Sequence, residues 1–156
     1  MIRPGRDDDG AAFERLIGVC WREYGDLSEV RGEIPDIDKF ATATAAAGGA
    51  LWSAMASGQV VGMVVTTPAE HCWHLSRMYV AKAQRGSGLA VDLLLTAENH
   101  VRRSGGTCMV LWSDVLFTRA HRFYEKHGYL RRGGVRTADN PAQSIEAGFS
   151  KLLVTH

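Results

Sequence analysis

The sequence predicts an α+β fold, a mixed α/β sandwich in which helices flank a mostly antiparallel sheet with one parallel pair of strands. Three observations predict it. A strand, an amphipathic helix and a second strand follow one another between Trp73 and Trp112, which requires a parallel pair with a right-handed crossover. The second of these strands, Thr107–Trp112, is a continuous apolar run typical of buried parallel strands. The other strand-like segments look antiparallel, as in the pair around the Ser57-Gly58 turn.

The chain is expected to form one domain over residues 1–156, because this length suffices for a single sizeable core. A short strand is predicted at Met1–Arg3. A helix follows over residues 7–24, with acidic residues in its first turn and Gly25 at its end. Its apolar residues share one face: Phe13, Leu16, Ile17 and Cys20. Asp36 can cap a second helix, which a pair of glycines ends after about Ala47.

The middle of the chain is predicted to contain three strands and a long helix. Residues 51–56 and 59–67 are expected to form two strands around a Ser57-Gly58 turn. Trp73–Val80 is predicted to be a further strand. The apolar spacing after it predicts a helix over about residues 88–103.

The C-terminal part is predicted to contain one more helix and two strands. Thr118 can cap this helix, which carries Tyr124 and ends at Gly128. The strands are expected over residues 129–136 and 144–154.

Composition argues against several classes of function. A net charge of +1 gives no electrostatic footprint for nucleic acid or a membrane surface. Residues 40–69 carry no charge, but they are rich in small and polar residues and interrupted by glycines, so a membrane span is not expected. The N-terminus lacks the apolar region of a secretory signal. We therefore expect a cytoplasmic protein.

The three cysteines, Cys20, Cys72 and Cys108, are odd in number, widely spaced and without a C-x-x-C pair. That pattern fits a reducing cytosol and offers no zinc site. We therefore expect no metal, and we expect each cysteine to fill a small space in the core.

The residues with the clearest chemistry lie between Tyr79 and Ala90, at a strand end, a turn and a helix start. A helix N-terminus presents unpaired N–H groups and the positive end of the helix dipole, so it binds anions. Gly86 and Gly88 allow the backbone to approach such an anion, and Arg85 adds a positive charge. The segment is neither a P-loop nor a dinucleotide fingerprint, since it lacks the lysine of the first and the third glycine of the second. It predicts a site for a phosphate-bearing cofactor.

Two motifs together resemble one family. Arg85-x-x-Gly88-x-Ala90 resembles the pyrophosphate-binding signature Gln/Arg-x-x-Gly-x-Gly/Ala of the GCN5-related N-acetyltransferases. The segment AHRFYEKHGY over residues 120–129 resembles that family's Ala-x-x-Phe-Tyr-Glu-Lys-x-Gly-Phe/Tyr motif. The resemblance covers residues 72–153. It implies acetyl-CoA as the cofactor and a sheet in which the two parallel strands splay apart.

The resemblance also implies roles for particular residues. Tyr124 matches the family tyrosine that commonly serves as general acid, and a phenol with a pKa of about 10 is protonated at neutral pH. Backbone groups of the strand end would pair with the pantetheine arm, and the N–H groups of the loop would hold the pyrophosphate. The implied cofactor-binding residues are Met78, Tyr79, Val80, Arg85, Gly86, Ser87, Gly88, Leu89, Ala90 and Tyr124.

The general base is less well specified. Glu70, His71 and His74 lie where this family often recruits a base, and His74 is our candidate because the pKa of imidazole lies near neutrality. A structural or merely exposed position is the alternative for each of them. The sequence also departs from the family, because Phe117 occupies a position where an Asn frequently helps to hold coenzyme A. The residues that could replace this Asn are Ser113, Asp114 and Thr118.

We expect an acetyl-CoA-dependent N-acetyltransferase that acetylates a primary amine of a small molecule, or an exposed protein or peptide amine, by direct attack in a ternary complex. Two alternatives stay open: a coenzyme A-binding sensor or accessory domain without turnover, and an acyltransferase that uses a longer acyl-CoA. A homodimer is expected by family analogy alone.

The resemblance implies that the acceptor contacts the first two helices, their connection over residues 24–40 and the hairpin at residues 137–143. The first of these segments is acidic, which suits a cationic amine, and an ordinary solvated surface is the alternative explanation. Its acidic residues, with one that precedes it, are Glu23, Asp26, Glu29, Glu33, Asp36 and Asp38.

Overall fold

The computed structural model describes residues 1–139 and 143–153, in which seven strands and five helices are present. The strands are β1 Ile2–Pro4, β2 Ala50–Ala56, β3 Gln59–Pro68, β4 Trp73–Val80, β5 Cys108–Asp114, β6 Leu130–Thr137 and β7 Ile145–Leu152. The helices are α1 Gly10–Arg22, α2 Val30–Glu33, α3 Phe40–Ala46, α4 Leu89–Arg103 and α5 Thr118–Lys126. Three short 3₁₀ turns add η1 Asp7–Asp9, η2 Ile37–Lys39 and η3 Lys82–Gln84.

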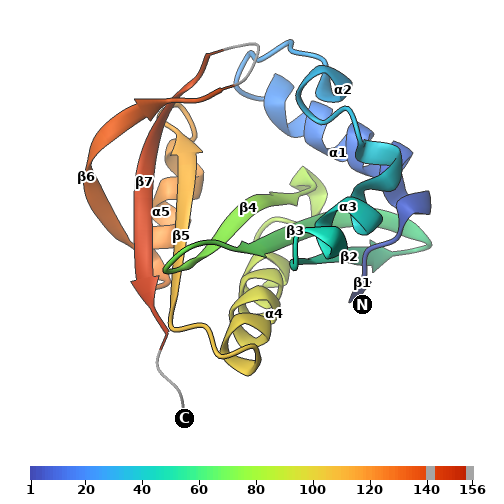
Figure 1. The fold of residues 1–156 in the computed structure, drawn as a ribbon. Coiled ribbons are helices and arrows are strands. Elements are labelled where there is room, and N and C mark those ends of the chain that lie inside the picture. The colour runs from blue at the N-terminus through green and yellow to red at the C-terminus, as the bar shows by residue number, and fades with distance from the viewer. Residues whose placement is uncertain (140–142, 154–156) are drawn as a thin grey trace.

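All seven strands form one sheet in the order β1-β2-β3-β4-β5-β7-β6 (Figure 1). The pair β4–β5 is parallel, and every other neighbouring pair is antiparallel. The long helix α4 connects the parallel pair, as the crossover requires. The predicted fold class is therefore confirmed.

Helices cover both faces of the sheet, and a hydrophobic core lies on each face. Successive side chains of β3 point to opposite faces, so they enter different cores. Val64 packs with residues of α4 and α5, whereas Met63 and Val65 pack with residues of α1. Figure 1 shows α1, α2 and α3 grouped beside the β1–β3 end of the sheet, with α4 on the opposite face. Residues on the two faces of β4 can therefore reach two different groups of helices.

The parallel strands β4 and β5 are paired over only a short length. Their register consists of Trp73 opposite Met109 and His74 opposite Val110. From Leu75 onward β4 keeps its antiparallel partner β3 but has no register partner on β5 among the described residues. The sheet is therefore opened between these two strands toward their C-terminal ends, as the family resemblance implies.

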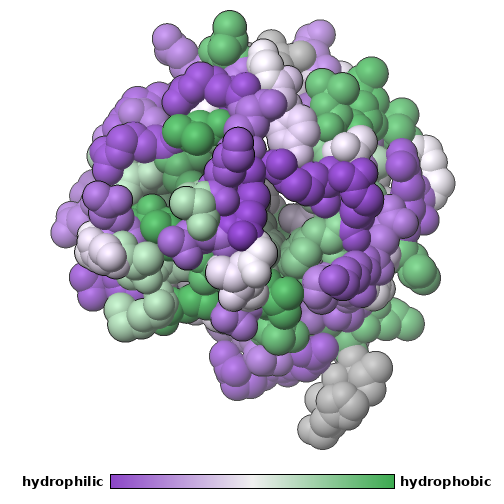
Figure 2. All heavy atoms as spheres, turned by 180° about the vertical axis from the view of Figure 1, so that it is seen from behind, coloured by the Kyte–Doolittle hydropathy of each residue, from purple (hydrophilic) through white to green (hydrophobic). Residues whose placement is uncertain are grey.

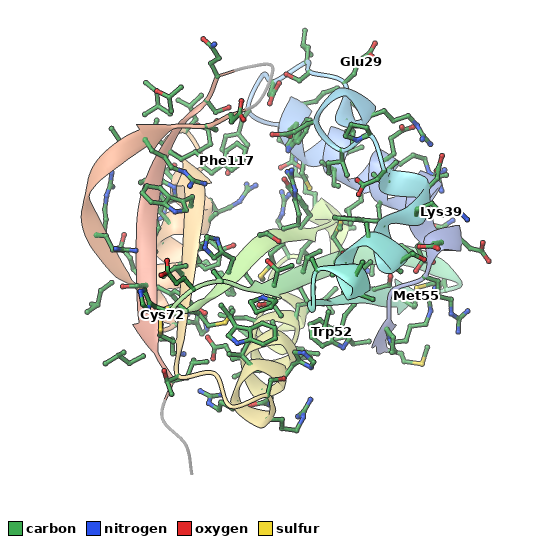
Figure 3. The ribbon with its side chains drawn as sticks, viewed as in Figure 1. Glu29, Lys39, Trp52, Met55, Cys72 and Phe117 are labelled. Carbon is green, nitrogen blue, oxygen red and sulfur yellow. A yellow bond between two sulfur atoms is a disulfide. The ribbon has the colours of Figure 1, made fainter. Side chains whose placement is uncertain are left out.

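A disulfide between Cys72 and Cys108 joins the starts of β4 and β5, with 4.9 Å between the two Cα atoms (Figure 3). The expectation of three core-filling cysteines is therefore wrong for this pair and correct for Cys20, which is buried with a free thiol. The pairing has no local signal, because 36 residues separate the two cysteines and only the parallel crossover brings them together. A bridge that closes a loop of this length stabilises a fold by about 3–4 kcal/mol in the chain-entropy account.

Local differences from the predicted elements lie mostly in the N-terminal half. The helix expected from Asp36 to Ala47 is divided into η2 and α3, and α2 was not predicted because four residues give no periodicity. Neither Asp36 nor Thr118 caps a helix through its side chain, and Phe117 is the N-cap of α5. The end of the last predicted strand, Val154, lies outside the described residues.

The uncharged segment over residues 40–69 forms α3 and the β2–β3 hairpin. Within the described part of the chain, every helix is too short or too polar to cross a bilayer.

Candidate functional site

Two cavities meet where β4 and β5 separate. The first, which we call the loop cavity, has a volume of about 280 Å³ and lies between the end of β4, the loop after it, α1 and α5. The second, the acidic cavity, has a volume of about 120 Å³ and lies between β4, β5, β7 and the segment that follows α1. Tyr79 and Tyr124 line both. Seen from behind, the surface is hollowed near its middle, with apolar surface inside a largely hydrophilic rim (Figure 2).

The loop cavity contains most of the residues that the sequence assigns to the cofactor. Those that line it are Met78, Tyr79, Val80, Arg85, Gly86, Ala90 and Tyr124. Ser87, Gly88 and Leu89 form the adjoining turn and the first residue of α4. The sequence therefore identified one contiguous wall of this cavity.

The turn before α4 has an exposed backbone. Gly86 and Gly88 have φ angles of +82° and +89°, a conformation that favours glycine. A Cβ atom built on either glycine would meet nothing within 4 Å. Gly88 is the N-cap of α4 and provides no side chain to satisfy the first amides of the helix. The first amide of the helix, that of Leu89, donates to Ser87 Oγ at 3.4 Å, and the amides that follow it, with the positive end of the helix dipole, can bind a phosphate group.

Arg85 has partners that its sequence motif does not predict. Its Nη1 lies 2.7 Å from a carboxylate oxygen of Glu23, which follows α1. Its Nη2 donates to the carbonyl oxygen of Val80 at 3.3 Å. Glu23 also binds Arg119 of α5 at 3.0 Å, and its hydrogen bonds with both arginines lower its pKa. Glu23 therefore joins the anion-binding loop to both helices that flank the loop cavity.

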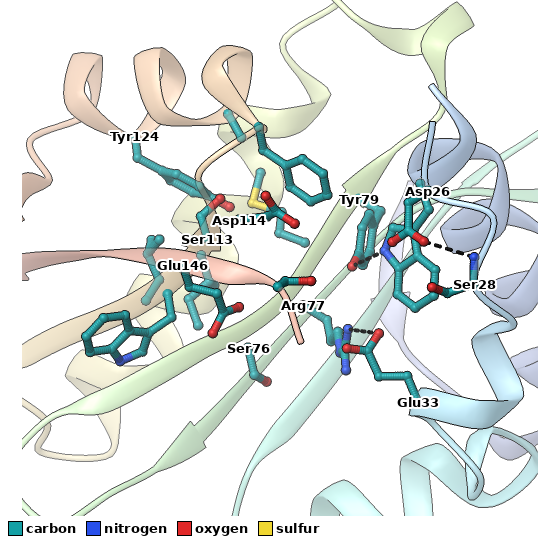
Figure 4. A pocket seen from close by; sticks show the side chains of 18 residues that line it. Asp26, Ser28, Glu33, Ser76, Arg77, Tyr79, Ser113, Asp114, Tyr124 and Glu146 are labelled. Carbon is teal, nitrogen blue, oxygen red and sulfur yellow. Dashed lines mark hydrogen bonds and ion pairs between the residues drawn. The ribbon is translucent and has the colours of Figure 1, made fainter. Parts of the chain in front are cut away.

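Tyr124 is the predicted residue with the most unusual surroundings. Its side chain is buried, with 8% of the residue exposed, and burial raises its pKa well above the ordinary value of 10.0. Its hydroxyl has no hydrogen-bond partner among the described residues, and it points into the acidic cavity beside Ser113 and Asp114 (Figure 4). One turn earlier on α5, His121 fixes the helix to β5, because its Nε2 lies 3.2 Å from Ser113 Oγ and 2.9 Å from the Asp114 carbonyl oxygen.

His74 lies apart from these residues. It lines a third cavity of about 400 Å³, the outer cavity, which shares Arg77 and Glu146 with the acidic cavity. Burial and the charge of Arg136 lower the pKa of His74 below 6.5. The structure therefore brings Tyr124 together with the cofactor-binding residues but places His74 one cavity away. Of the other base candidates, Glu70 and His71 are largely exposed side chains.

Sequence reasoning missed side chains that several distant elements bring to the site. The hydroxyl of Tyr79, a residue singled out for its backbone, accepts a hydrogen bond from Trp21 Nε1 at 3.0 Å. Glu146 lies opposite Asp114 in the register of β5 and β7. In the acidic segment, Asp26 and Glu33 line the acidic cavity, whereas Glu29 is exposed and points outward (Figure 3). The segment's net charge was visible in the sequence, but which acids face inward was not.

An open parallel pair with a helix N-terminus at the opening is the arrangement that the resemblance implies for a coenzyme A-binding fold, and the comparisons with known proteins agree. Residues 13–129 match the family model described as Acetyltransferase (GNAT) family. N-acetyltransferase 8F1 of Rattus norvegicus is 31% identical over 124 residues, which are 76% of this chain and 54% of that protein. The chain likewise spans about half the length of two other curated relatives that it matches.

Solved structures show the same fold at low sequence identity. A GNAT-family acetyltransferase from Staphylococcus aureus Mu50 has a TM-score of 0.84 at 17% identity, covering 99% of each chain. The structure of yncA from Salmonella typhimurium with its cofactor acetyl-CoA has a TM-score of 0.78 at 17% identity, covering 100% of this chain and 95% of that one. The chain belongs to the GNAT acetyltransferase family.

This family uses acetyl-CoA, and the residues present here fit that group. The loop has open space above two glycines and leads into the N-terminus of α4, where the amides after that of Leu89 point toward the opening, as a pyrophosphate requires. The backbone of β4 beyond His74 faces the opening rather than β5, so it is available to an extended arm. The loop cavity is predominantly apolar around Met78, Ala90 and Phe123, which suits a pantetheine chain.

Proposed function

We propose that this protein is an acetyl-CoA-dependent N-acetyltransferase that transfers an acetyl group to a primary amine by direct attack in a ternary complex. The observation that carries the proposal is the position of Tyr124. Its unpartnered hydroxyl lies at the junction of the loop cavity, which fits the cofactor, and the acidic cavity, which is left for an acceptor. Two reactants held in these cavities would meet at one proton donor.

Acetyl-CoA supplies the acetyl thioester: the amine nitrogen forms a bond to the carbonyl carbon, and the carbon–sulfur bond breaks. The N–H groups of residues 85–90 hold the pyrophosphate, and the free edge of β4 at residues 78–80 orients the arm. Tyr124 donates its proton to the sulfur as negative charge develops there. Burial raises the pKa of this phenol, so the hydroxyl carries its proton at neutral pH.

We further propose that His74 accepts, through water, the proton that the amine loses. Its lowered pKa keeps the imidazole neutral at pH 7, so it can accept a proton there. The acid limb of kcat/KM against pH should have its midpoint below 6.5, since the protonated imidazole is inactive. His74→Gln should remove this limb and lower kcat about 100-fold. The exposed His71 provides the control, as His71→Gln should leave the profile unchanged; an acid limb that survives in His74→Gln would assign the base elsewhere.

The cofactor site is tested by the shift of unfolding temperature with acetyl-CoA. At a hundred times its Kd the ligand should stabilise the protein by about 2.7 kcal/mol. Gly88→Glu should lose this shift, because it places a strained, negatively charged residue where the pyrophosphate binds. Gly58 in the β2–β3 turn is a matched control: its φ is +75° with nothing within 4 Å, so Gly58→Glu carries similar strain and charge but should keep the shift.

The two alternatives are distinguished by turnover once acetyl-CoA is bound. If acetyl-CoA binds and no amine is acetylated, the chain is a coenzyme A sensor or accessory domain. If a longer acyl-CoA gives the higher kcat/KM, the donor assignment changes and the roles of the loop and Tyr124 remain. An absent shift in the well-folded protein contradicts the cofactor assignment itself.

We also propose a cytoplasmic location and a homodimer. The first rests on the N-terminal sequence alone, because the Cys72–Cys108 disulfide removes the support that the cysteine pattern gave, and the same disulfide makes the location testable. Alkylation of these thiols in intact cells would indicate a reducing compartment, whereas protection of both would argue against the cytoplasm. Sedimentation of the purified protein tests the dimer.

A further inference from the structure

The acidic cavity contains more negative than positive charge. Among the residues that the structure describes, four carboxylates line it, those of Asp26, Glu33, Asp114 and Glu146, and Arg77 is the single guanidinium. Two of the carboxylates are paired. Glu33 lies 3.5 Å from Arg77, and Glu146 lies 3.0 Å from Arg136 at the edge of the outer cavity.

Asp26 and Asp114 are the carboxylates without a cation. In each, Oδ1 accepts one backbone N–H at 2.9 Å, from Ser28 and Leu116 respectively. No ion pair to either aspartate occurs within residues 1–139 and 143–153. Both are half-buried, and they lie on opposite walls of the cavity (Figure 4). Two negative charges therefore face a partly desolvated space, where an added cation interacts more strongly than in water.

A second, independent observation indicates that a ligand enters this space. The Tyr124 hydroxyl belongs to a residue with 8% exposure, has no hydrogen-bond partner among the described residues and points into the same cavity. Within the described residues no fully buried polar side-chain atom lacks a partner, so this hydroxyl is open to the cavity, where a ligand or water can complete its hydrogen bonding. The uncompensated charge and the proton donor of the proposed reaction thus share one cavity.

We propose that the acceptor is a small diamine or polyamine, an inference that rests on the proposed function. One amino group attacks the thioester beside Tyr124. A second amino group stays protonated, binds Asp26 and Asp114, and takes no part in the bond changes. A monoamine loses its only positive charge when it becomes the nucleophile, which leaves both aspartates uncompensated during the reaction. A diamine keeps one ammonium in place throughout, so its binding energy persists in the transition state.

The test compares acceptors that share a reactive end. Coenzyme A release is measured with 1,4-diaminobutane, with 1-aminobutane and with 4-aminobutanoate. The diamine should have a kcat/KM about tenfold or more above that of the monoamine, a factor that corresponds to about 1.4 kcal/mol. The acid should be the poorest of the three, because its carboxylate meets like charge.

Variants that remove one negative charge test whether Asp26 and Asp114 cause the preference for the diamine. Asp26→Asn and Asp114→Asn keep an Oδ1 atom for the Ser28 and Leu116 amides, so the local turns are preserved. Each should lower kcat/KM for the diamine about tenfold relative to that for the monoamine. Asp36→Asn is the matched control, since Asp36 belongs to the same acidic segment but does not line the cavity. It should change neither value.

The outcomes separate this inference from the proposed function. Equal kcat/KM for diamine and monoamine, with normal turnover, overturns the diamine assignment and leaves the acetyltransferase intact. If no amine is acetylated, the proposed function fails. The inference is then decided by binding: 1,4-diaminobutane, but not 1-aminobutane, should raise the unfolding temperature of the parent protein and not of Asp26→Asn. A preference for lysine peptides over free diamines overturns the small-molecule assignment.

Discussion

Tyr124→Phe should lower kcat by roughly 10² to 10⁴-fold while the KM for acetyl-CoA stays nearly constant. The change removes one oxygen atom from a side chain that otherwise keeps its packing against Tyr129 and Phe149. The removed hydroxyl makes no hydrogen bond within the described residues, so no partner is left unsatisfied. The unfolding temperature should therefore be unchanged or slightly raised. Steady-state kinetics and thermal unfolding of one preparation give both values.

A second phenol of the loop cavity controls for general effects on the site. Tyr24 lines that cavity and packs against Phe117, with 4.5 Å between the ring centroids. Tyr24→Phe should keep kcat within about twofold, because its hydroxyl does not line the acidic cavity. A fall in kcat of less than about threefold in Tyr124→Phe would reduce Tyr124 to a packing residue. Equal losses in both variants would point to altered cofactor binding.

The parts of the site that the sequence predicted are those built from contiguous residues. The loop from Arg85 to Ala90 forms its anion site from its own backbone, so two glycines and a helix start suffice to identify it. The strand β4 was predicted with the same bounds that the structure shows, because it is followed directly by that loop. Tyr124 was found through a motif whose helix also ends at a glycine.

The parts that the sequence did not predict depend on which strands become neighbours. Glu146 reaches the acidic cavity through its register with Asp114, and no spacing along the chain encodes that register. The Cys72–Cys108 bridge has the same origin, since the parallel pairing of β4 and β5 brings the two residues together. Asp26 and Glu29 are equally acidic in sequence, and only the path of the chain after α1 turns one inward.

The opening between β4 and β5 makes the protein depend on other connections between the two parts of its sheet. Strands β1–β4 and strands β5–β7 share only two register pairs in the described residues. The disulfide adds a covalent connection at the closed end of the opening. A second connection comes from α4, which packs on β2, β3 and β4. The carboxylate of its residue Glu98 binds Lys151 of β7 and Tyr129, which directly precedes β6, so it reaches the part of the sheet formed by β5–β7.

Glu98→Ala should lower the free energy of unfolding by about 3–5 kcal/mol, the cost of removing one partner from a buried charge pair. Glu98 has 0% exposure. Its carboxylate accepts hydrogen bonds from the hydroxyl of Tyr129 at 2.8 Å and the ammonium of Lys151 at 3.1 Å, both on the far side of the opening, and it lies 3.8 Å from Arg102 of α4 itself. Without it, the Tyr129 hydroxyl is buried without an acceptor and Lys151 loses its counter-charge. Urea unfolding followed by circular dichroism measures the change.

Two further variants separate the charge from the shape of this side chain. Glu98→Gln keeps an acceptor for Tyr129 but removes the ion pair with Lys151, so its loss should be smaller than that of Glu98→Ala. Glu125→Ala on the exposed face of α5 should change the free energy of unfolding by no more than about 0.5 kcal/mol. If Glu98→Ala also changes the free energy of unfolding by no more than about 0.5 kcal/mol, α4 does not hold the two parts of the sheet together through its buried carboxylate. If Glu98→Ala is strongly destabilised while Glu98→Gln has nearly the free energy of unfolding of the parent protein, the stabilisation comes from the Tyr129 hydrogen bond alone.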